Sequence, residues 1–218
     1  MRKVFDGNMY NGQELNTSCK CHNGYYSEIL NYIKILMDDM INRHSSVFFV
    51  RFDLTYPACS SSVYPNNNDL VSKFSETFML YCKRHRYDAK YIWVRELSVT
   101  GQFHYHFMLL LNGNIIQKAH PLILGYATNL WQNYLGIENG KGLVELCDSE
   151  GKYYFYDDKY GGVKIKRKDP HFQQIYAKCY QVASYLAKRY SKGGLPSHVN
   201  GFGCSRISWG DSILIPVD

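Results

Sequence analysis

The sequence of 218 residues has no apolar run that approaches the roughly 20 residues needed to cross a membrane. Its first ten residues carry charges but no apolar core and no small-residue cleavage site, so they do not have the pattern of a secretory signal. These absences predict a cytoplasmic protein with no membrane partner.

The cysteines do not form the pattern of a disulfide framework. There are seven, an odd number, at positions 19, 21, 59, 82, 147, 179 and 204. We therefore expect reduced thiols. Cys19, Cys21 and His22 could contribute to a metal site, but no second pair of ligands follows at the spacing of a zinc site, so a loop is the simpler interpretation.

The composition indicates a globular chain with one main domain. It is 45% hydrophobic and contains 20 tyrosines. The formal net charge is +6, and two runs, 83–86 and 164–168, concentrate the basic residues. Basic runs favour polyanionic partners, although many such runs are only solvated surface.

The pattern of apolar residues predicts helices alternating with strands. We expect helices over 25–42, 69–86 with Asp69 as N-cap, 121–135 and 172–190. We expect strands over 47–56, 91–97, 103–111 and 143–147, a further hairpin of 153–156 with 162–166, and strand-like pieces at 205–208 and 213–215. This order predicts an α+β fold, an antiparallel sheet sandwich with flanking helices.

A pair of histidines lies in the apolar run from Phe103 to Leu111. His104 and His106 are two apart on a strand, so they project from the same face. Glu96 lies on the preceding strand, and a hairpin that pairs even residues with even residues places it on that face too. Two imidazoles and one carboxylate leave coordination positions open, which suits a catalytic divalent cation. Two partly buried histidines with no metal are the alternative interpretation.

The helix predicted over 172–190 carries a tyrosine among cations. On a helical projection Ile175, Cys179, Val182, Leu186 and Tyr190 form one apolar stripe. Tyr185 lies on a flank with Lys178, Gln181, Lys188 and Arg189, whereas Tyr176 and Tyr180 lie on the other flank. Positive charge near a tyrosine suits attack on a phosphodiester. Ordinary amphipathic packing is the alternative for any single tyrosine.

The strand predicted over 47–56 alternates between apolar and polar residues. Its polar face carries Arg51, Asp53 and Thr55. Beside the histidine strand, this face would flank the metal or bind the DNA backbone, with Thr55 donating to phosphate. A half-exposed structural strand is the alternative.

Three motifs in this order resemble the HUH superfamily of rolling-circle replication initiators, relaxases and single-strand transposases. Phe52 to Pro57 is similar to the first Rep motif, His104 to His106 to the second, and Tyr185 to Lys188 to the third, Tyr-x-x-Lys. The resemblance covers roughly residues 46–192. Within the superfamily, the chain looks most similar to replication initiators of inoviruses and related prophage proteins.

The resemblance implies an HUH/Rep endonuclease domain with a ferredoxin-like or RRM-like core over 46–192. Residues 1–45 would be an N-terminal arm and helix, and residues 193–218 a C-terminal tail packed on the same domain. The implied cofactor is Mg²⁺ or Mn²⁺ held by Glu96, His104 and His106. Tyr185 would be the nucleophile, assisted by Lys188.

The implied activity is metal-dependent, sequence-specific nicking and joining of single-stranded DNA, which initiates rolling-circle replication through a covalent 5′-phosphotyrosyl intermediate. The partners would be single-stranded DNA at an origin or hairpin and, because no Walker A pattern occurs in the sequence, a separate helicase and a polymerase. The residues expected to bind DNA are Arg51, Thr55, Lys178, Arg189, Lys164, Lys166, Arg167 and Lys168, with aromatic residues around 153–156. A relaxase or transposase with the same chemistry, and a non-catalytic DNA-binding regulator that keeps the fold, are the alternatives.

Overall fold

The computed structural model describes residues 3–17, 24–57, 64, 66–98, 101, 103–147, 161–190, 192 and 199–206. The first half of the chain contains β1 (Val4–Phe5), β2 (Met9–Tyr10), β3 (Gln13–Glu14), β4 (Tyr25–Tyr26), α1 (Ser27–Arg43), β5 (Ser46–Thr55), α2 (Asp69–Arg84) and β6 (Lys90–Leu97). The second half contains β7 (Phe103–Asn112), the π-helix η1 (Pro121–Ala127), α3 (Thr128–Leu135), β8 (Val144–Leu146), β9 (Val163–Lys166), α4 (Phe172–Ala183), the 3₁₀ helix η2 (Ser184–Ala187) and β10 (Phe202–Cys204).

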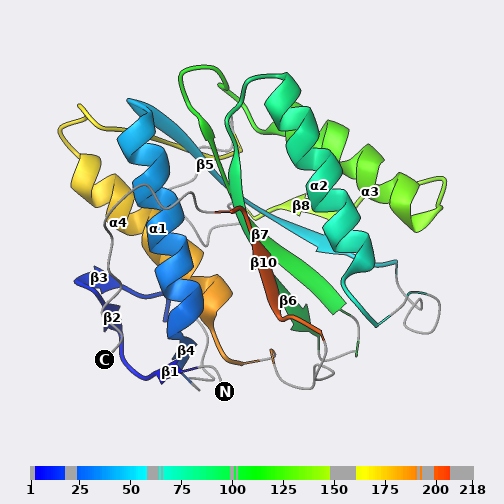
Figure 1. Ribbon diagram of the computed structural model, residues 1–218, viewed down its shortest axis with the longest axis horizontal. Helices are drawn as coiled ribbons and strands as arrows, with labels where there is room; N and C mark the ends of the chain where they lie inside the picture. The colour runs from blue at the N-terminus through cyan, green and yellow to red at the C-terminus, as the bar shows by residue number, and fades with distance from the viewer. Residues whose placement is uncertain are drawn as a thin grey trace.

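An antiparallel sheet forms the centre of the molecule (Figure 1). Its strands follow the order β10, β6, β7, β5, and the free edge of β5 pairs with β9 near its start and with β8 near its end. The fold is therefore α+β with a large antiparallel sheet, as the sequence predicted.

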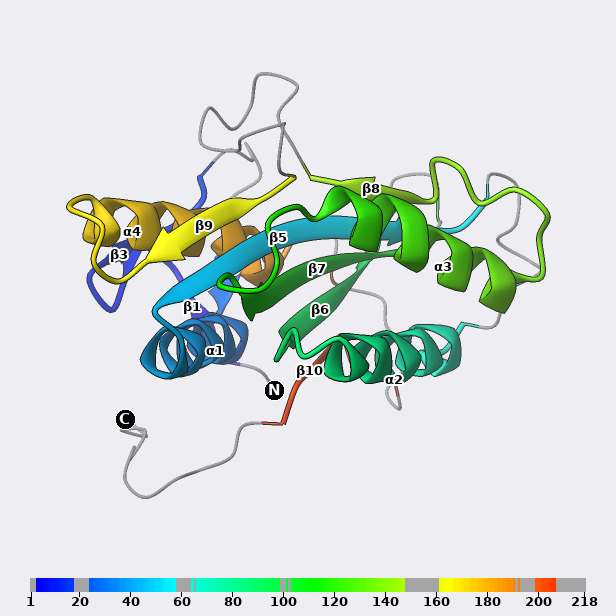
Figure 2. The ribbon, with the colours of Figure 1, turned by 90° about the horizontal axis from the view of Figure 1, so that it is seen from above.

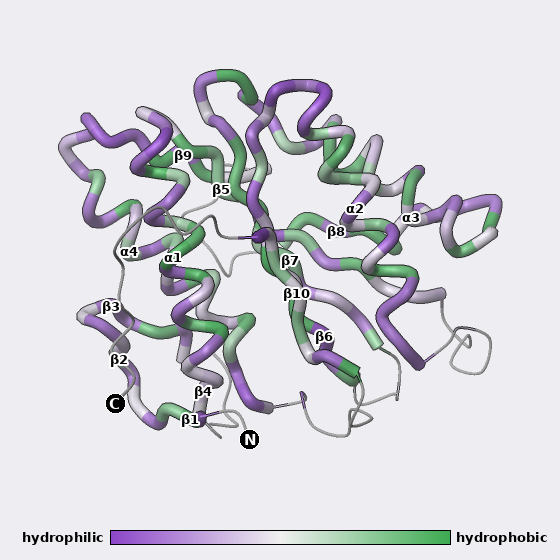
Figure 3. Tube along the Cα trace, in the orientation of Figure 1, coloured by the Kyte–Doolittle hydropathy of each residue, from purple (hydrophilic) through white to green (hydrophobic). Residues whose placement is uncertain are grey.

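Helices cover both faces of this sheet, with α1 and α4 on one side and α2 and α3 on the other (Figure 2). The alternation along β5 explains why both faces are apolar: Val47 and Phe49 face α1 and α4, whereas Phe48, Val50 and Phe52 face α2 and α3. Hydrophobic stretches accordingly mark β5, β6 and β7, while the helices alternate between hydrophobic and hydrophilic residues (Figure 3). The sheet therefore separates two hydrophobic cores.

Most of the predicted elements are present with small shifts in their ends, but the N-cap of α2 and the position of the tail strand differ from the prediction. Asp69 is the first residue of α2 rather than its N-cap, which is Asn68. The strand of the tail is β10, three residues before the predicted one, because Phe202 to Cys204 pair with the edge of β6. β9 pairs with β5. Its predicted partner, 153–156, lies outside the described residues, as do 213–215 and the group formed by Cys19, Cys21 and His22.

The predicted helix over 172–190 ends early. α4 stops at Ala183, a 3₁₀ turn follows, and Lys188 has an extended backbone that bridges to Tyr25. The hydroxyl of Ser184 donates to the carbonyl of Gln181 and accepts from the backbone N–H of Asn16, so the N-terminal arm holds this break. Tyr190, which was predicted in the buried stripe, is 41% exposed because the helical periodicity no longer applies to it.

Segments on both sides of the predicted central domain contribute to its structure. α1 lies in the same core cluster as β5, β6 and β7. β10 extends the sheet beyond β6. The sheet therefore depends on residues from outside 46–192.

Within the described residues, every helix is too short or too polar to cross a bilayer. Cys82, Cys147, Cys179 and Cys204 are free thiols, whereas the other three cysteines lie outside the described residues.

The core facing α2 and α3 generates a stability prediction. The ring of Phe52 is fully buried and stacks on Phe107, with 4.7 Å between ring centroids. Phe52→Ala should lower the free energy of unfolding by about 3 to 5 kcal/mol, because it leaves a cavity in a packed layer. The matched control is Leu80→Ala, whose side chain is 48% exposed and should change stability by less than about 1 kcal/mol. Urea titration measures both, and equal effects would contradict this packing.

Candidate metal centre and neighbouring tyrosine

The hairpin of β6 and β7 sets the positions of the three predicted ligands. Glu96 pairs directly with His104, and Val94 pairs with His106. Gly101 in the connecting turn has a φ of +78°, a left-handed conformation that suits glycine. The even-to-even register predicted from the sequence is therefore present, and Glu96, His104 and His106 share the face that α1 and α4 cover.

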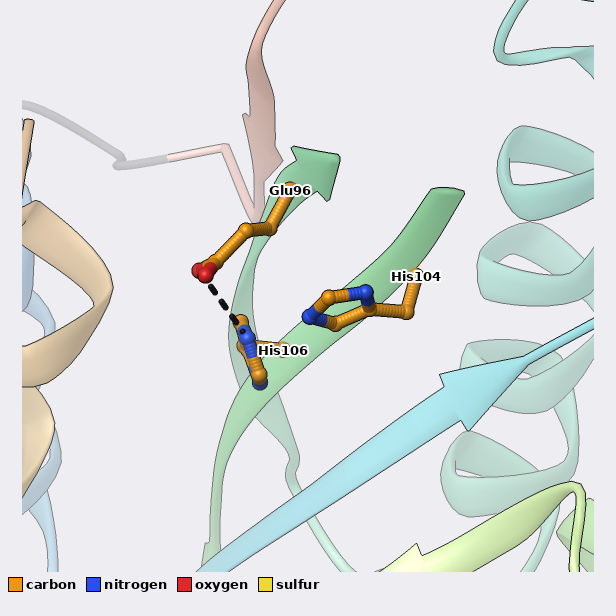
Figure 4. Close-up of side chains that lie close together, drawn as sticks. All are labelled: Glu96, His104 and His106. Carbon is orange, nitrogen blue, oxygen red and sulfur yellow. Dashed lines mark ion pairs between the residues drawn. The ribbon is translucent and has the colours of Figure 1, made fainter. Parts of the chain in front are cut away.

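The three side chains converge at one end of the hairpin (Figure 4). Their candidate ligand atoms all lie within 4.8 Å of one another. The Nε2 atom of His106 is 3.1 Å from Oε2 of Glu96, and the two imidazole rings are nearly perpendicular, with centroids 4.7 Å apart. The residues that could hold a metal ion are thus brought together by adjacent strand positions alone.

A fourth residue orients His106 from the neighbouring strand. Asp53 on β5 pairs with His106 across the ladder, and its Oδ1 atom lies 2.7 Å from Nδ1 of the imidazole. A hydrogen bond from Nδ1–H to a carboxylate is the usual support of a metal-binding histidine, because it directs the Nε2 lone pair to the metal. Nε2 of His106 is buried and faces Oε2 of Glu96 without a well-formed hydrogen bond, which fits a ligand atom.

The charges around the centre shift the pKa values of its members in different directions. Burial alone would lower the pKa of His106, but Asp53 and Glu96 together outweigh burial and raise it. Burial and the neighbouring His106 lower the pKa of His104. Burial would raise the pKa of Asp53, but His106 and Arg51 hold it below its usual value. The donor set is therefore one carboxylate, one imidazole whose lowered pKa favours its neutral form, and one imidazole whose raised pKa makes a proton compete with a metal.

This donor set fits a divalent cation with open coordination positions. Two imidazoles and one carboxylate are acceptable ligands for Mn²⁺, Zn²⁺ and related ions, and three protein ligands leave room for water or substrate. Glu96 is 9% exposed and His106 is 5% exposed. The centre is thus shielded from bulk water on the protein side.

Tyr185 lies against the centre on η2. Its ring meets that of His106 edge to face, with 5.2 Å between centroids and an interplanar angle of 86°. Among the described residues, three cationic groups surround the ring: Lys188 Nζ at 4.7 Å from the centroid, the Arg51 guanidinium carbon at 5.1 Å and Lys192 Nζ at 5.9 Å. Positive charge here stabilises negative charge on a phenol oxygen or on a phosphate beside it.

The two tyrosines on α4, Tyr176 and Tyr180, lie in the core. The hydroxyl of Tyr176 donates to Asp38, and that of Tyr180 donates to the carbonyl of Leu30. Burial, first of all, raises the pKa of both phenols strongly. Of the three tyrosines on α4 and η2, Tyr185 is therefore the one that lies against the candidate metal centre.

Lys188 is held by the N-terminal arm. Its ammonium donates to Oδ1 of Asn16 at 3.1 Å, and the side chain is 7% exposed. Asn16 is itself fixed, because its carbonyl accepts from the hydroxyl of Tyr25. The predicted proximity of Lys188 to Tyr185 is present, but the N-terminal arm produces it rather than a continuous helix.

Arg51 and Thr55 are next to the centre but face protein groups. Arg51 is 2% exposed, and its guanidinium contacts Asp53, the carbonyl of Val182 and the sulfur of Cys147. Thr55 pairs with His104 across the ladder and donates to the carbonyl of Leu143. In this arrangement Arg51 supports Asp53, so its predicted contact with DNA backbone would require a conformational change.

The remaining predicted DNA-binding cations are not gathered at the centre. Lys178 is exposed and donates to Gln181, and Arg189 is exposed. The group Lys164, Lys166, Arg167 and Lys168 lies on β9 and the turn after it, beside the first residues of β5. Lys164 pairs with Phe48, five residues before Asp53, so it lies roughly 17 Å along the strand from the centre. The cations on β9 and the turn after it therefore lie far from the candidate metal centre.

Sequence reasoning missed Lys192. Its ammonium lies 3.2 Å from Oε2 of Glu96, and the residue is 6% exposed. Asp53 was recognised only as part of a polar face that flanks the metal, not as the partner of His106. A basic residue shortly after the Tyr-x-x-Lys motif was visible in the sequence, but nothing local indicated that it returns to the sheet.

The contact between Asp53 and His106 generates a metal-binding prediction. Asp53→Asn should weaken Mn²⁺ binding by roughly 10- to 100-fold, because an amide is a poorer support for the ligating imidazole. Isothermal titration calorimetry measures this change. Glu138→Gln removes an exposed carboxylate elsewhere and is the control. Equal affinities for Asp53→Asn and the control would contradict the supporting role.

The raised pKa of His106 predicts how metal binding depends on pH. In the metal-free protein His106 keeps its proton above the usual pH range for histidine, and that proton must leave before Nε2 can bind a metal. Mn²⁺ affinity should therefore rise with pH, by up to about tenfold per unit below the pKa of His106. Calorimetry in buffers of different ionisation enthalpy measures the released proton. An Mn²⁺ affinity independent of pH between 5.5 and 8 would contradict proton release from His106.

The comparisons with known proteins identify the family of this chain. Residues 8–205 match the model of the YagK/YfjJ C-terminal domain. The chain is 25% identical over 200 residues to the uncharacterized protein YfjJ of Escherichia coli strain K12, covering 80% of this chain and 91% of that protein. It is 26% identical over 212 residues to the uncharacterized protein YagK of the same strain, covering 85% and 96%. No solved structure matches the chain. Because the family model spans most of the sequence, the chain belongs to the YagK/YfjJ C-terminal domain family.

Proposed function

We propose that this protein is a metal-dependent endonuclease and strand transferase for single-stranded DNA, with Tyr185 as its nucleophile. The observation that carries the proposal is the contact between two parts: a centre of Glu96, His104 and His106, and a tyrosine packed on His106 and surrounded by cations. A metal-binding protein without this chemistry would not need the tyrosine.

In the proposed reaction each of these groups has a role. Mg²⁺ or Mn²⁺ bound by Glu96, His104 and His106 would polarise the scissile phosphate. The phenol oxygen of Tyr185 attacks phosphorus, the new O–P bond forms as the bond to the 3′ oxygen breaks, and the strand keeps a 5′-phosphotyrosyl link. The phenol loses its proton and the departing 3′ oxygen gains one.

The cations would stabilise the negative charge that develops during this step. Lys188 and Lys192 flank the ring of Tyr185, so they lie where negative charge would gather on the phosphate oxygens. The phosphotyrosyl ester conserves the energy of the broken bond. A 3′ hydroxyl can therefore attack it and reseal the strand without ATP.

The biological setting that the proposal favours is initiation of rolling-circle replication, in which the free 3′ hydroxyl primes synthesis. The substrate would be single-stranded DNA at an origin or hairpin, and a separate helicase and polymerase would be needed. A relaxase or a single-strand transposase would use the same groups on a transfer origin or an element end.

The test is covalent adduct formation with single-stranded oligonucleotides in the presence of Mn²⁺. Wild type should form a protein–DNA adduct that survives denaturing electrophoresis, and Tyr185→Phe should lose it by at least about 100-fold while retaining DNA affinity. Tyr180→Phe is the matched control, because this tyrosine lies on the same segment but in the core. Binding without any adduct, across metals and substrates, would favour a non-catalytic DNA-binding regulator instead.

A further inference from the structure

Lys192 occupies an unusual position for a lysine. The side chain is almost fully buried, and its ammonium contacts the same oxygen of Glu96 that faces His106. A buried carboxylate needs positive charge nearby, and in the metal-free protein this ammonium supplies it together with His106. The same oxygen is also a candidate ligand atom of the metal centre.

A divalent cation bound to Oε2 of Glu96 would repel the ammonium of Lys192 from its present position. A metal ion lies about 2 Å from a carboxylate ligand atom. The ammonium is already 3.2 Å from Oε2, so the two positive charges would be at most about 5 Å apart in a poorly solvated site. Their repulsion favours withdrawal of the more flexible partner, which is the lysine, on its four-carbon stem.

The neighbouring phenol ring indicates where the withdrawn ammonium can act. Lys192 Nζ lies 5.9 Å from the centroid of the Tyr185 ring. Lys188 and Arg51, the other two cations at this ring, are held by Asn16 and by Asp53 with Val182. Those two contacts do not involve the metal ligands. The contact of Lys192 with Glu96, in contrast, is made to a candidate ligand atom, so metal binding would break it.

We propose that Lys192 is a metal-displaced counter-ion: it neutralises Glu96 in the metal-free protein, and metal binding releases its ammonium to bind a DNA phosphate beside Tyr185. Metal binding and phosphate binding would then be coupled, because one event provides the cation for the other. The displacement rests on the metal centre alone, whereas the phosphate contact rests on the proposed function.

Mn²⁺ calorimetry without DNA tests the displacement. Lys192→Met should bind Mn²⁺ about tenfold more tightly than wild type, because the metal no longer competes with an ammonium for Glu96. The metal-free variant should also melt at a lower temperature than wild type, and saturating Mn²⁺ should reduce that difference. The control is Lys178→Met, which removes an exposed lysine and should change neither quantity.

A second variant keeps the test decisive if Lys192→Met does not fold. Lys192→Arg retains the charge and can hold the carboxylate with two hydrogen bonds, so Mn²⁺ affinity should fall below that of wild type. Unchanged or weaker Mn²⁺ binding in Lys192→Met, or unchanged or tighter binding in Lys192→Arg, would overturn the displacement.

DNA binding tests the second half of the proposal in the Tyr185→Phe background, where no adduct forms. Mn²⁺ should increase the affinity for a single-stranded oligonucleotide, and Lys192→Met should make that increase smaller than in the Tyr185→Phe parent, despite its tighter metal binding. An undiminished increase would overturn the phosphate contact while leaving the displacement intact. Failure of wild type to form an adduct would count against the proposed function and not against the calorimetric result.

Discussion

The register of the β6–β7 hairpin is the constraint on which the candidate site depends. Glu96 and His104 face each other as a direct pair, and His106 follows on the same face. A slip of one residue would turn Glu96 toward α2 and α3, away from both imidazoles. The apolar residues of both strands prevent such a slip, because Val94 and Met108 belong to one core and Trp93 and Phe107 to the other. Packing on two faces thus fixes the geometry of the candidate metal centre.

Ion pairs between largely buried side chains connect other segments of the chain to this hairpin. The carboxylates of Asp53 and Glu96 lie among Arg51, His106 and Lys192, so each buried negative charge has positive neighbours. Segments far apart in the sequence supply these groups, and the N-terminal arm adds Asn16 as the anchor of Lys188. The centre is therefore a product of the whole fold, although its three ligands come from a single hairpin.

Features that depend on local periodicity could be predicted from the sequence, whereas features that depend on contacts between distant segments could not. The face shared by Glu96, His104 and His106 follows from the two-residue repeat of a strand, so it could be predicted from sixteen consecutive residues, 91–106. The contact of Asp53 with His106 requires that β5 pair with β7, which no local pattern specifies. The early end of α4 and the return of Lys192 to Glu96 depend on tertiary contacts, which override helical propensity.

The measurement that tests the central claim most directly is peptide mapping by tandem mass spectrometry after wild-type protein has reacted with a single-stranded oligonucleotide and Mn²⁺. The account predicts a nucleotide 5′-phosphate on Tyr185 as the single modified residue. A nucleotide on another side chain, or cleaved DNA with no modified peptide, would contradict a centre in which the metal ligands and this tyrosine act on one phosphate.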